Sequence, residues 1–291
     1  MDMLYFPGCT IKTSAKVLES SAFAVAEALG HTFVEMEEWN CCGVVASLTE
    51  DDLMHHLAPL RNLIRVEDQK QEQLFVLCDM CGNTLKQTNL RLDDRPADLE
   101  TLNSFMDLEN DYNRSVQVVH FLEFLRDQVG FDQLKKRVER PLKGLRIMPY
   151  YGCTLLRPRE VAIDDSEDPK IMADLLSVLG AEVVDSRYKI ECCGSYHTID
   201  LKENVVQKSF RISASAQDRQ AEAIMLSCPM CKFNLDFRGK EATNVNLGHK
   251  ALPVYYYTQL MALALGLDIS VCGFDSHAVD PVPLLKKKGI I

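Results

Sequence analysis

A chain of 291 residues, 47% hydrophobic and 25% charged, has the composition of a globular protein that can bury a sizeable core, and its length favours two domains. The formal net charge of −10 argues against a nucleic-acid partner, because such binding depends on basic patches that neutralise phosphates. Residues 1–6 lack the features of a signal peptide, and the most apolar stretch, residues 252–267, is too short and too interrupted for a membrane span. We therefore expect a cytoplasmic protein with no membrane span.

Short apolar runs alternate with helical segments, in the same order in both halves of the chain. This alternation predicts an α/β fold in which each half forms a small, mostly parallel sheet flanked by helices. We expect a tandem duplication of two Rossmann-like domains, residues 1–143 and 144–291, related by a pseudo-twofold axis. The predicted strands are residues 4–6, 32–36, 74–77 and 116–119 in the first half, and a segment from residue 147, then 182–184, 224–226 and 254–256, in the second.

Capping residues mark the expected starts of the helices, because a short polar side chain can accept hydrogen bonds from the free N–H groups of the first turn. The acidic, poorly patterned residues 91–115 do not follow this scheme, and we expect them to form an inserted loop or lid. The expected caps are Thr13 or Ser14, Thr49 with Asp52 for a long helix to about Gln71, Asp168, and Asp200 with Glu203.

Ten of the eleven cysteines form two copies of one pattern: a single cysteine after glycine, then Cys-Cys-Gly, then CxxC. In a reducing compartment, so many cysteines favour metal ligands or redox groups over structural disulfides. Each cysteine segment follows a predicted strand, so we expect both sets at the carboxyl edge of a sheet, where α/β proteins bind ligands. The first set is Cys9, Cys41, Cys42, Cys78 and Cys81; the second set is Cys153, Cys192, Cys193, Cys228 and Cys231.

Five thiols in each set exceed the four that a tetrahedral zinc site or an ordinary cubane cluster needs. Two adjacent cysteines reach one ligand only through an irregular loop, and Gly43 and Gly194 supply the required backbone freedom. Sulfur-only ligation selects zinc, copper(I) or iron–sulfur, and the fifth thiolate favours a cluster of several irons. The alternatives are two Cys₄ zinc sites with a spare cysteine each, and a thioredoxin-like CxxC, which accounts for only two of the five thiols.

The duplicated pattern, with its opening LYFPGCT and the YYGCT of the second half, resembles the CCG-domain proteins over the whole chain, and most closely the B subunit of heterodisulfide reductase. The resemblance implies that each set of five cysteines holds one noncubane [4Fe-4S] cluster. It also implies that a disulfide, the coenzyme M–coenzyme B heterodisulfide of methanogenesis or a related one, is reduced to two thiols between the two clusters.

The resemblance further implies partner subunits, because the chain has neither a CxxCxxCxxxC ferredoxin motif nor a GxGxxG flavin fingerprint. In the family, a small iron–sulfur protein (the C subunit) carries cubane clusters and a large flavin-containing protein (the A subunit) carries out electron bifurcation, often with a hydrogenase or formate dehydrogenase. The alternative function is a non-catalytic electron-transfer subunit, as in the CCG proteins of lactate, glycolate or glycerol-3-phosphate oxidation.

Residues outside the two sets have weaker signals. His197 follows the second Cys-Cys-Gly and is the candidate proton donor, the alternative being a loop histidine that is satisfied by the backbone. His120 begins a predicted helix and can approach the same edge, and Cys272 is expected to be a buried or idle thiol. Five basic residues near the cysteine loops can pair with an anionic substrate group or remain solvated surface charges: Lys12, Lys86, Arg157, Lys189 and Lys232.

Overall fold

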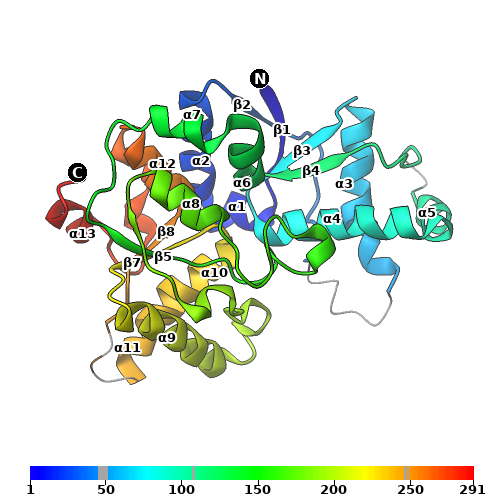
Figure 1. The fold of residues 1–291 in the computed structure, drawn as a ribbon. Coiled ribbons are helices and arrows are strands. Elements are labelled where there is room, and N and C mark those ends of the chain that lie inside the picture. Colours follow the sequence, from blue (N-terminus) through cyan, green and yellow to red (C-terminus); the bar gives the residue numbers. More distant parts are fainter. Residues whose placement is uncertain (45–51, 107–108, 246–247, 249) are drawn as a thin grey trace.

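Two four-stranded sheets, one in each half of the chain, form the centre of the computed structural model, which describes residues 1–44, 52–106, 109–245, 248 and 250–291 (Figure 1). The strand orders are β2-β1-β3-β4 and β6-β5-β7-β8, and all of these pairings are parallel. The predicted duplicated α/β fold is therefore confirmed. The strands are β1 Asp2–Phe6, β2 Thr32–Glu35, β3 Gln73–Val76, β4 Gln117–His120, β5 Arg146–Pro149, β6 Glu182–Val183, β7 Ala223–Leu226 and β8 Val254–Tyr256.

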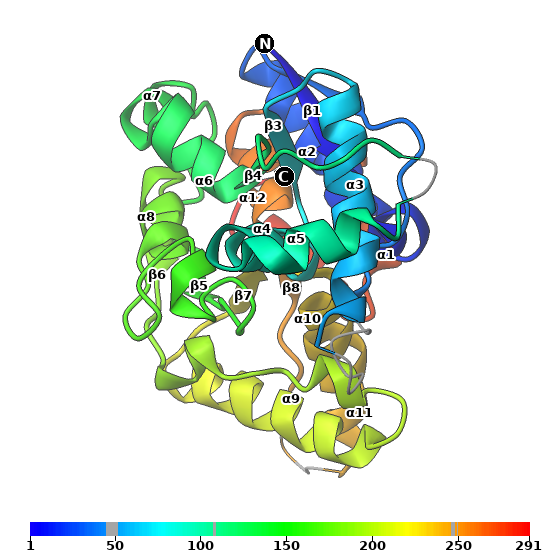
Figure 2. The ribbon, with the colours of Figure 1, turned by 90° about the vertical axis from the view of Figure 1, so that its right-hand side faces the viewer.

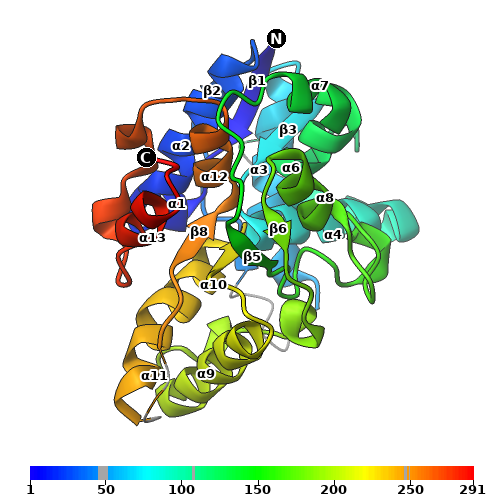
Figure 3. The ribbon, with the colours of Figure 1, turned by 60° about the vertical axis from the view of Figure 1, so that its left-hand side comes forward.

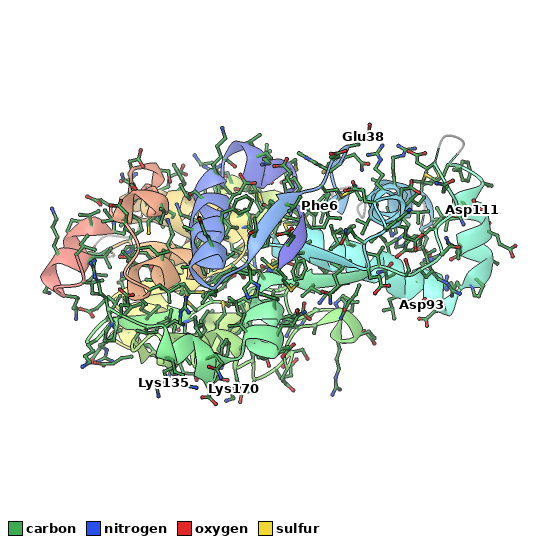
Figure 4. All side chains as sticks on the ribbon, turned by 90° about the horizontal axis from the view of Figure 1, so that it is seen from above. Phe6, Glu38, Asp93, Asp111, Lys135 and Lys170 are labelled. Atoms are coloured by element: carbon green, nitrogen blue, oxygen red, sulfur yellow. The ribbon has the colours of Figure 1, made fainter. Side chains whose placement is uncertain are left out.

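The inner strands are apolar on both faces because helices cover each sheet from both sides. Leu74, Phe75 and Val76 of β3 are buried, and so is the whole of β7. Continuous apolar runs of this kind are typical of parallel strands with two covered faces. In the view from above, Phe6 at the end of β1 lies inside the molecule, whereas charged side chains such as Glu38 and Lys135 lie at its rim (Figure 4).

Helices follow most of the strands and form the crossover connections that parallel strands need. In the first half they are α1 Cys9–Thr13, α2 Lys16–Ala28, α3 Leu57–Asp68, α4 Asp79–Asp94, α5 Pro96–Asn103, α6 Phe121–Phe124 and α7 Phe131–Lys136. In the second half they are α8 Ile171–Val178, α9 Lys202–Asp218, α10 Pro229–Phe233, α11 Gly239–Val245, α12 Tyr257–Ala264 and α13 Val282–Lys287. Short π-helical turns extend α6 at Leu125–Val129 and α10 at Asn234–Arg238.

A helix from each half packs against a helix of the other half. Helix α12, which follows the last strand of the second half, packs against α2 of the first half (Figures 1 and 3). Reciprocally, α7, beyond the last strand of the first half, packs against α8 of the second. The hydroxyls of Ser21 and Thr258, both buried, are 2.7 Å apart in the first of these contacts. This reciprocal packing holds the halves in one body and brings their sheet edges together.

The expected loop at residues 91–115 is largely helical, so that prediction was wrong. Helix α4 continues to Asp94 and Pro96 starts α5, which lies crosswise in front of the end of α4 in the side view (Figure 2). Proline is well suited to a first helical turn because its missing N–H has no intrahelical partner there. Leu92 and Leu102 are completely buried, which explains why an acidic segment still packs as helix.

The expected caps of the first half were also wrong, apart from Thr49, which lies outside the described residues. Helix α2 starts after Ala15, and no side chain caps it. The hydroxyl of Thr13 instead donates to the carbonyl of Cys9 within α1. The long helix of this half begins at Leu57, after a 3₁₀ turn over Met54–His56.

The expected caps of the second half were wrong as well. Asp164, rather than Asp168, accepts hydrogen bonds of 2.6 Å from the N–H groups of Lys170 and Ile171 at the start of α8. Helix α9 starts after Leu201 without a side-chain cap. At α8, hydrogen bonding in the folded loop decides which aspartate is the cap, and at α9 the expected side-chain cap is absent.

Candidate functional site

The first set of cysteines gathers at the carboxyl ends of β1, β2 and β3. Cys9 starts α1, Cys41 and Cys42 lie in the loop after β2, and Cys78 precedes α4, whose first turn contains Cys81. The Sγ atoms of Cys9 and Cys41 are 3.6 Å apart. The Cys42 thiol interacts with those of Cys41 and Cys81, and the Cys81 thiol also interacts with that of Cys78. The five thiols therefore form one continuous group.

The second set repeats this arrangement at the carboxyl ends of β5, β6 and β7. The Sγ atoms of Cys193 and Cys231 are 3.4 Å apart, and Cys231 also interacts with Cys228. The Cys153 thiol interacts with that of Cys192. The predicted grouping of the ten cysteines into two sets at the sheet edges thus matches their placement in the fold.

A glycine in each half allows the chain to pass directly beside a thiol of its set. Gly8 has a φ of 70°, and a Cβ at this position would be 3.0 Å from the Sγ of Cys81. Gly152 has a φ of 69°, and its Cβ would be 3.3 Å from the Sγ of Cys231. Residues with side chains rarely adopt this backbone conformation and would also crowd the sulfur. Both halves therefore reserve the same space beside the last cysteine of the set.

The thiols of each set differ in acidity because they hydrogen-bond to one another. The pKa of Cys42 is lowered to about 4, first by the thiols of Cys41 and Cys81. The pKa of Cys192 is lowered to about 5, mainly by the thiol of Cys153. The thiols of Cys193 and Cys228, followed by burial, raise the pKa of Cys231. The pKa of Cys193 is also lowered, mainly by the thiol of Cys231. In both sets the lowered pKa values thus fall on the Cys-Cys pair, which favours the thiolate form that binds metals.

Among the described residues, no three histidine, cysteine or carboxylate side chains gather as a site for a single metal ion. The case for a larger group rests on the sulfur-only donors, the contacts that link the thiols of each set, and the space kept clear by Gly8 and Gly152. Soft thiolate donors in this number fit an iron–sulfur cluster.

The two sets adjoin each other through a buried polar contact that joins the halves. Ser227, the residue before Cys228, donates a hydrogen bond of 2.8 Å to Oδ2 of Asp79, the residue after Cys78. The other carboxylate oxygen of Asp79 is 3.2 Å from Nε2 of His120, and both side chains are almost completely buried. No sequence motif marks this contact, because its residues are 148 positions apart.

A second link between the halves lies one turn further along α4. The amide of Asn83 donates hydrogen bonds of 2.8 Å to the carbonyls of Thr154 and Arg157, in the segment after Cys153. A cavity of about 10 Å³ lies beside this link and is lined by Asp79, Asn83 and His120 among others. Its size is about that of one water molecule. Hydrogen bonds from Ser227 and Asn83 thus join the halves beside a cavity with room for about one water molecule.

The CCG cysteine-rich domain matches this chain twice, over residues 3–86 and 147–236, which together contain all ten cysteines of the two sets. The chain belongs to the CCG family. The expected resemblance to the B subunit of heterodisulfide reductase is confirmed by relatives of that name that align with nearly the whole chain.

Relatives of the CCG protein carry two kinds of name. The B subunit of the ferredoxin/F420H2-dependent CoB-CoM heterodisulfide reductase from Methanosarcina acetivorans is 26% identical, over 97% of this chain and 95% of its own length. A protein from Archaeoglobus profundus, named as like the B subunit of heterodisulfide reductase, is 25% identical over 90% of both chains. The 8-methylmenaquinol:fumarate reductase membrane anchor subunit from Wolinella succinogenes is 28% identical, over 97% and 99% respectively.

One solved structure has the same fold as the CCG protein. A hypothetical protein from Helicobacter pylori superposes with a TM-score of 0.77 over 95% of this chain, at 10% identity. The match covers 51% of the Helicobacter chain, so this CCG protein spans about half of its length. Within the parts of our chain that the structure describes, no helix is both long and apolar enough to cross a membrane.

The two candidate histidines of this CCG protein have opposite environments. The side chain of His197 is 57% exposed, and its Nδ1 lies 3.3 Å from a carboxylate oxygen of Asp200. His120 is buried against Asp79, as described above, and begins α6 as expected. Cys272 is buried, its pKa is raised to about 12 by burial, and its thiol donates to the carbonyl of Gln259, which confirms it as a buried thiol outside both sets.

The five basic residues near the cysteine loops all have carboxylate partners. Four of these residues have their ion pairs at or near the surface, whereas the pair of Lys232 with Asp236 is buried, which contradicts a solvated charge at this position. Each of the five amino or guanidinium groups would therefore have to leave a carboxylate partner to bind an anionic substrate. The pairs are Lys12 with Glu19 and Glu35, Lys86 with Glu123, Arg157 with Glu167, Lys189 with Asp168 and Asp185, and Lys232 with Asp236.

Lys208 of α9 is a further basic residue at the site, and sequence reasoning missed it. Its Cδ is 3.2 Å from the position that a Cβ on Gly194 would occupy, so its side chain covers the second Cys-Cys-Gly turn. The positive charge of Lys208 contributes to the lowered pKa of Cys192. No sequence signal marks it, because Lys208 lies 16 residues from Cys192 on a different element.

Proposed function

We propose that this CCG protein is the catalytic subunit of a heterodisulfide reductase-like complex, with one noncubane [4Fe-4S] cluster in each of two domains, residues 1–143 and 144–291. The observation that carries the proposal is the pair of complete five-thiol sets that adjoin at the Asp79–Ser227 contact. The relatives named as B subunits of heterodisulfide reductases support the same function. We place the complex in the cytoplasm.

Each set of cysteines would hold its cluster through side chains that the fold already brings together. When bound, such a cluster supplies one-electron transfers and a Lewis-acidic iron that can accept sulfur. Cys42, Cys78 and Cys81 are buried, as are Cys193, Cys228 and Cys231, so these ligands are shielded from water. Cys9 and Cys41 are exposed and Cys153 and Cys192 are partly exposed, which leaves one side of each set open to a substrate or partner.

The proposed reaction adds two electrons and two protons to a disulfide, whose S–S bond breaks to give two thiols. The electrons come from outside the chain, because it lacks a ferredoxin motif and a flavin fingerprint. We propose as donors the iron–sulfur C subunit and the flavin-containing A subunit of such a complex, with a hydrogenase or formate dehydrogenase upstream. His197 is the proposed proton donor, because it is exposed and Asp200 orients its ring.

A second function is favoured by two observations. The relative from Wolinella succinogenes is named as part of a fumarate reductase, which acts on no disulfide by that name. The basic residues predicted to bind an anionic substrate are each paired with a carboxylate. The alternative is therefore a non-catalytic subunit that only passes electrons through its two clusters to another chain.

A disulfide-reduction assay separates the two functions. We expect anaerobically purified protein, given a strong artificial electron donor, to convert coenzyme M–coenzyme B heterodisulfide or a related disulfide to two thiols. We expect no turnover with a ferredoxin or hydrogenase system until the iron–sulfur and flavin subunits are added. Protein with a full iron content that reduces none of the disulfides with the artificial donor would support the electron-transfer function instead.

A further inference from the structure

The two Cys-Cys-Gly turns lie against equivalent helices that carry different residues at the point of contact. Helices α3 and α9 both end shortly before a residue with positive φ, Lys70 at 56° and Gln220 at 64°. Ala58 and Lys208 each lie twelve residues before these markers, so they occupy equivalent positions in the duplicated fold. The duplication has therefore placed alanine in one half where the other half has lysine.

The contacts with the glycines confirm this equivalence. A Cβ on Gly43 would lie 2.9 Å from the Cβ of Ala58, and a Cβ on Gly194 would lie 3.2 Å from Cδ of Lys208. Each helix thus packs the residue at this equivalent position against the glycine of its Cys-Cys-Gly turn. In the first half this residue contributes a methyl group, and in the second half it contributes an alkyl chain with a positive charge at its end.

Lys208 and Lys232, two lysines near the second set, differ in their ionic partners. Among the described residues, Lys208 has no carboxylate within ion-pair distance, whereas Lys232, which follows Cys231, is buried in a pair with Asp236. Asp79 lies on the other side of the second set, toward Cys228, where it accepts the hydrogen bond of Ser227 and faces His120. Lys208 therefore places a cationic side chain against the Cys-Cys-Gly turn of the second set, on the side away from Asp79.

We propose that the positive charge of Lys208 makes the second CCG site easier to reduce than the first. Lys208 is thus a positioning residue, which acts by directing electrons to the second site. This inference rests on the proposed function, in which each cysteine set holds an iron–sulfur cluster. One-electron reduction adds one negative charge to a cluster, and a nearby positive charge stabilises that reduced state. Because Ala58 offers no such charge, an electron shared between the two sites settles on the second one.

A redox titration followed by electron paramagnetic resonance tests the proposal in the holoprotein. In Lys208→Gln, we expect the midpoint potential of the second site to fall, so that the electron equilibrium between the sites shifts about tenfold toward the first, or about 59 mV for a one-electron couple. Lys208→Arg keeps the charge and is expected to retain the wild-type midpoints. The signals are assigned with Cys42→Ser and Cys193→Ser, each of which leaves one set complete.

Two further variants serve as matched controls. Ala58→Lys places a charge at the equivalent position of the first half, and we expect it to raise the midpoint of the first site. Lys202→Gln removes a lysine of the same helix that is paired with Glu241 at 3.0 Å, and both midpoints are expected to stay unchanged. If Lys208→Gln fails to retain its second cluster, Ala58→Lys decides: a first-site midpoint that does not rise overturns the proposal.

Iron analysis of the same samples separates this inference from the proposed function. Wild-type protein without iron would overturn the proposed function and, with it, the basis of the inference. A wild-type iron content with an unchanged second-site midpoint in Lys208→Gln would overturn the role of Lys208 alone.

Discussion

Cys193→Ser is expected to abolish disulfide reduction while the protein keeps about half of its iron, about four of eight atoms. The Cys193 thiol is completely buried, lies 3.4 Å from that of Cys231 and accepts a hydrogen bond from the amide of Asn234. Its loss should disable the second set, whereas the first set keeps its five cysteines. Turnover with an artificial donor and the iron content of the same sample are the two measurements.

Cys272→Ser is the matched control for this experiment. Cys272 is also a buried cysteine of the second half, but it lies outside both sets and donates to a backbone carbonyl, which a serine hydroxyl can also do. Iron content and turnover should remain at the wild-type level. Near-normal turnover in Cys193→Ser would show that the second set is dispensable, and loss of all iron would show that the two sets share ligands.

Gly8→Ala is expected to remove the cluster of the first half. The added Cβ would lie 3.0 Å from the Sγ of Cys81, a buried thiol that cannot move away freely. Gly8 has a φ of 70° and a ψ of 156°, a conformation almost restricted to glycine, which adds a backbone cost of about 1–3 kcal/mol for any residue with a side chain. Iron content should fall by about half, and the signal of the remaining cluster should match that of the second site.

Gly144→Ala separates the steric effect of Gly8→Ala from its backbone strain. Gly144 has a φ of 73°, close to that of Gly8, but a Cβ on it would meet no atom within 4 Å. We expect Gly144→Ala to lower the free energy of unfolding by about 1–3 kcal/mol and to retain all of its iron. Equal iron content in the two variants would contradict the role of Gly8 as the space beside Cys81.

Much of the fold follows from the local sequence, because central parallel strands are short apolar runs in any context. Residues 254–256 were predicted as a strand and form β8, and residues 74–77 overlap β3 almost completely. The grouping of the cysteines was also predictable, because parallel strands deliver their carboxyl ends to one edge of a sheet. The helical part of residues 91–115 was missed because its buried leucines are few and widely spaced.

Contacts between the halves could not be predicted from the sequence. Asp79 occupies a variable position of a CxxC motif, and only the packing of the two domains places it within 2.8 Å of Ser227. The same holds for the packing of α12 and α7 against helices of the other half. It also holds for the position of Lys208 against Gly194. Such contacts depend on the arrangement of two domains, for which the sequence contains no local pattern.

Iron and inorganic sulfide analysis of anaerobically purified wild-type protein tests the central claim most directly. Two sets of five thiols that each hold a [4Fe-4S] cluster predict about eight iron atoms per chain, with a matching amount of inorganic sulfide. Stoichiometric zinc in both halves, without inorganic sulfide, would contradict the account.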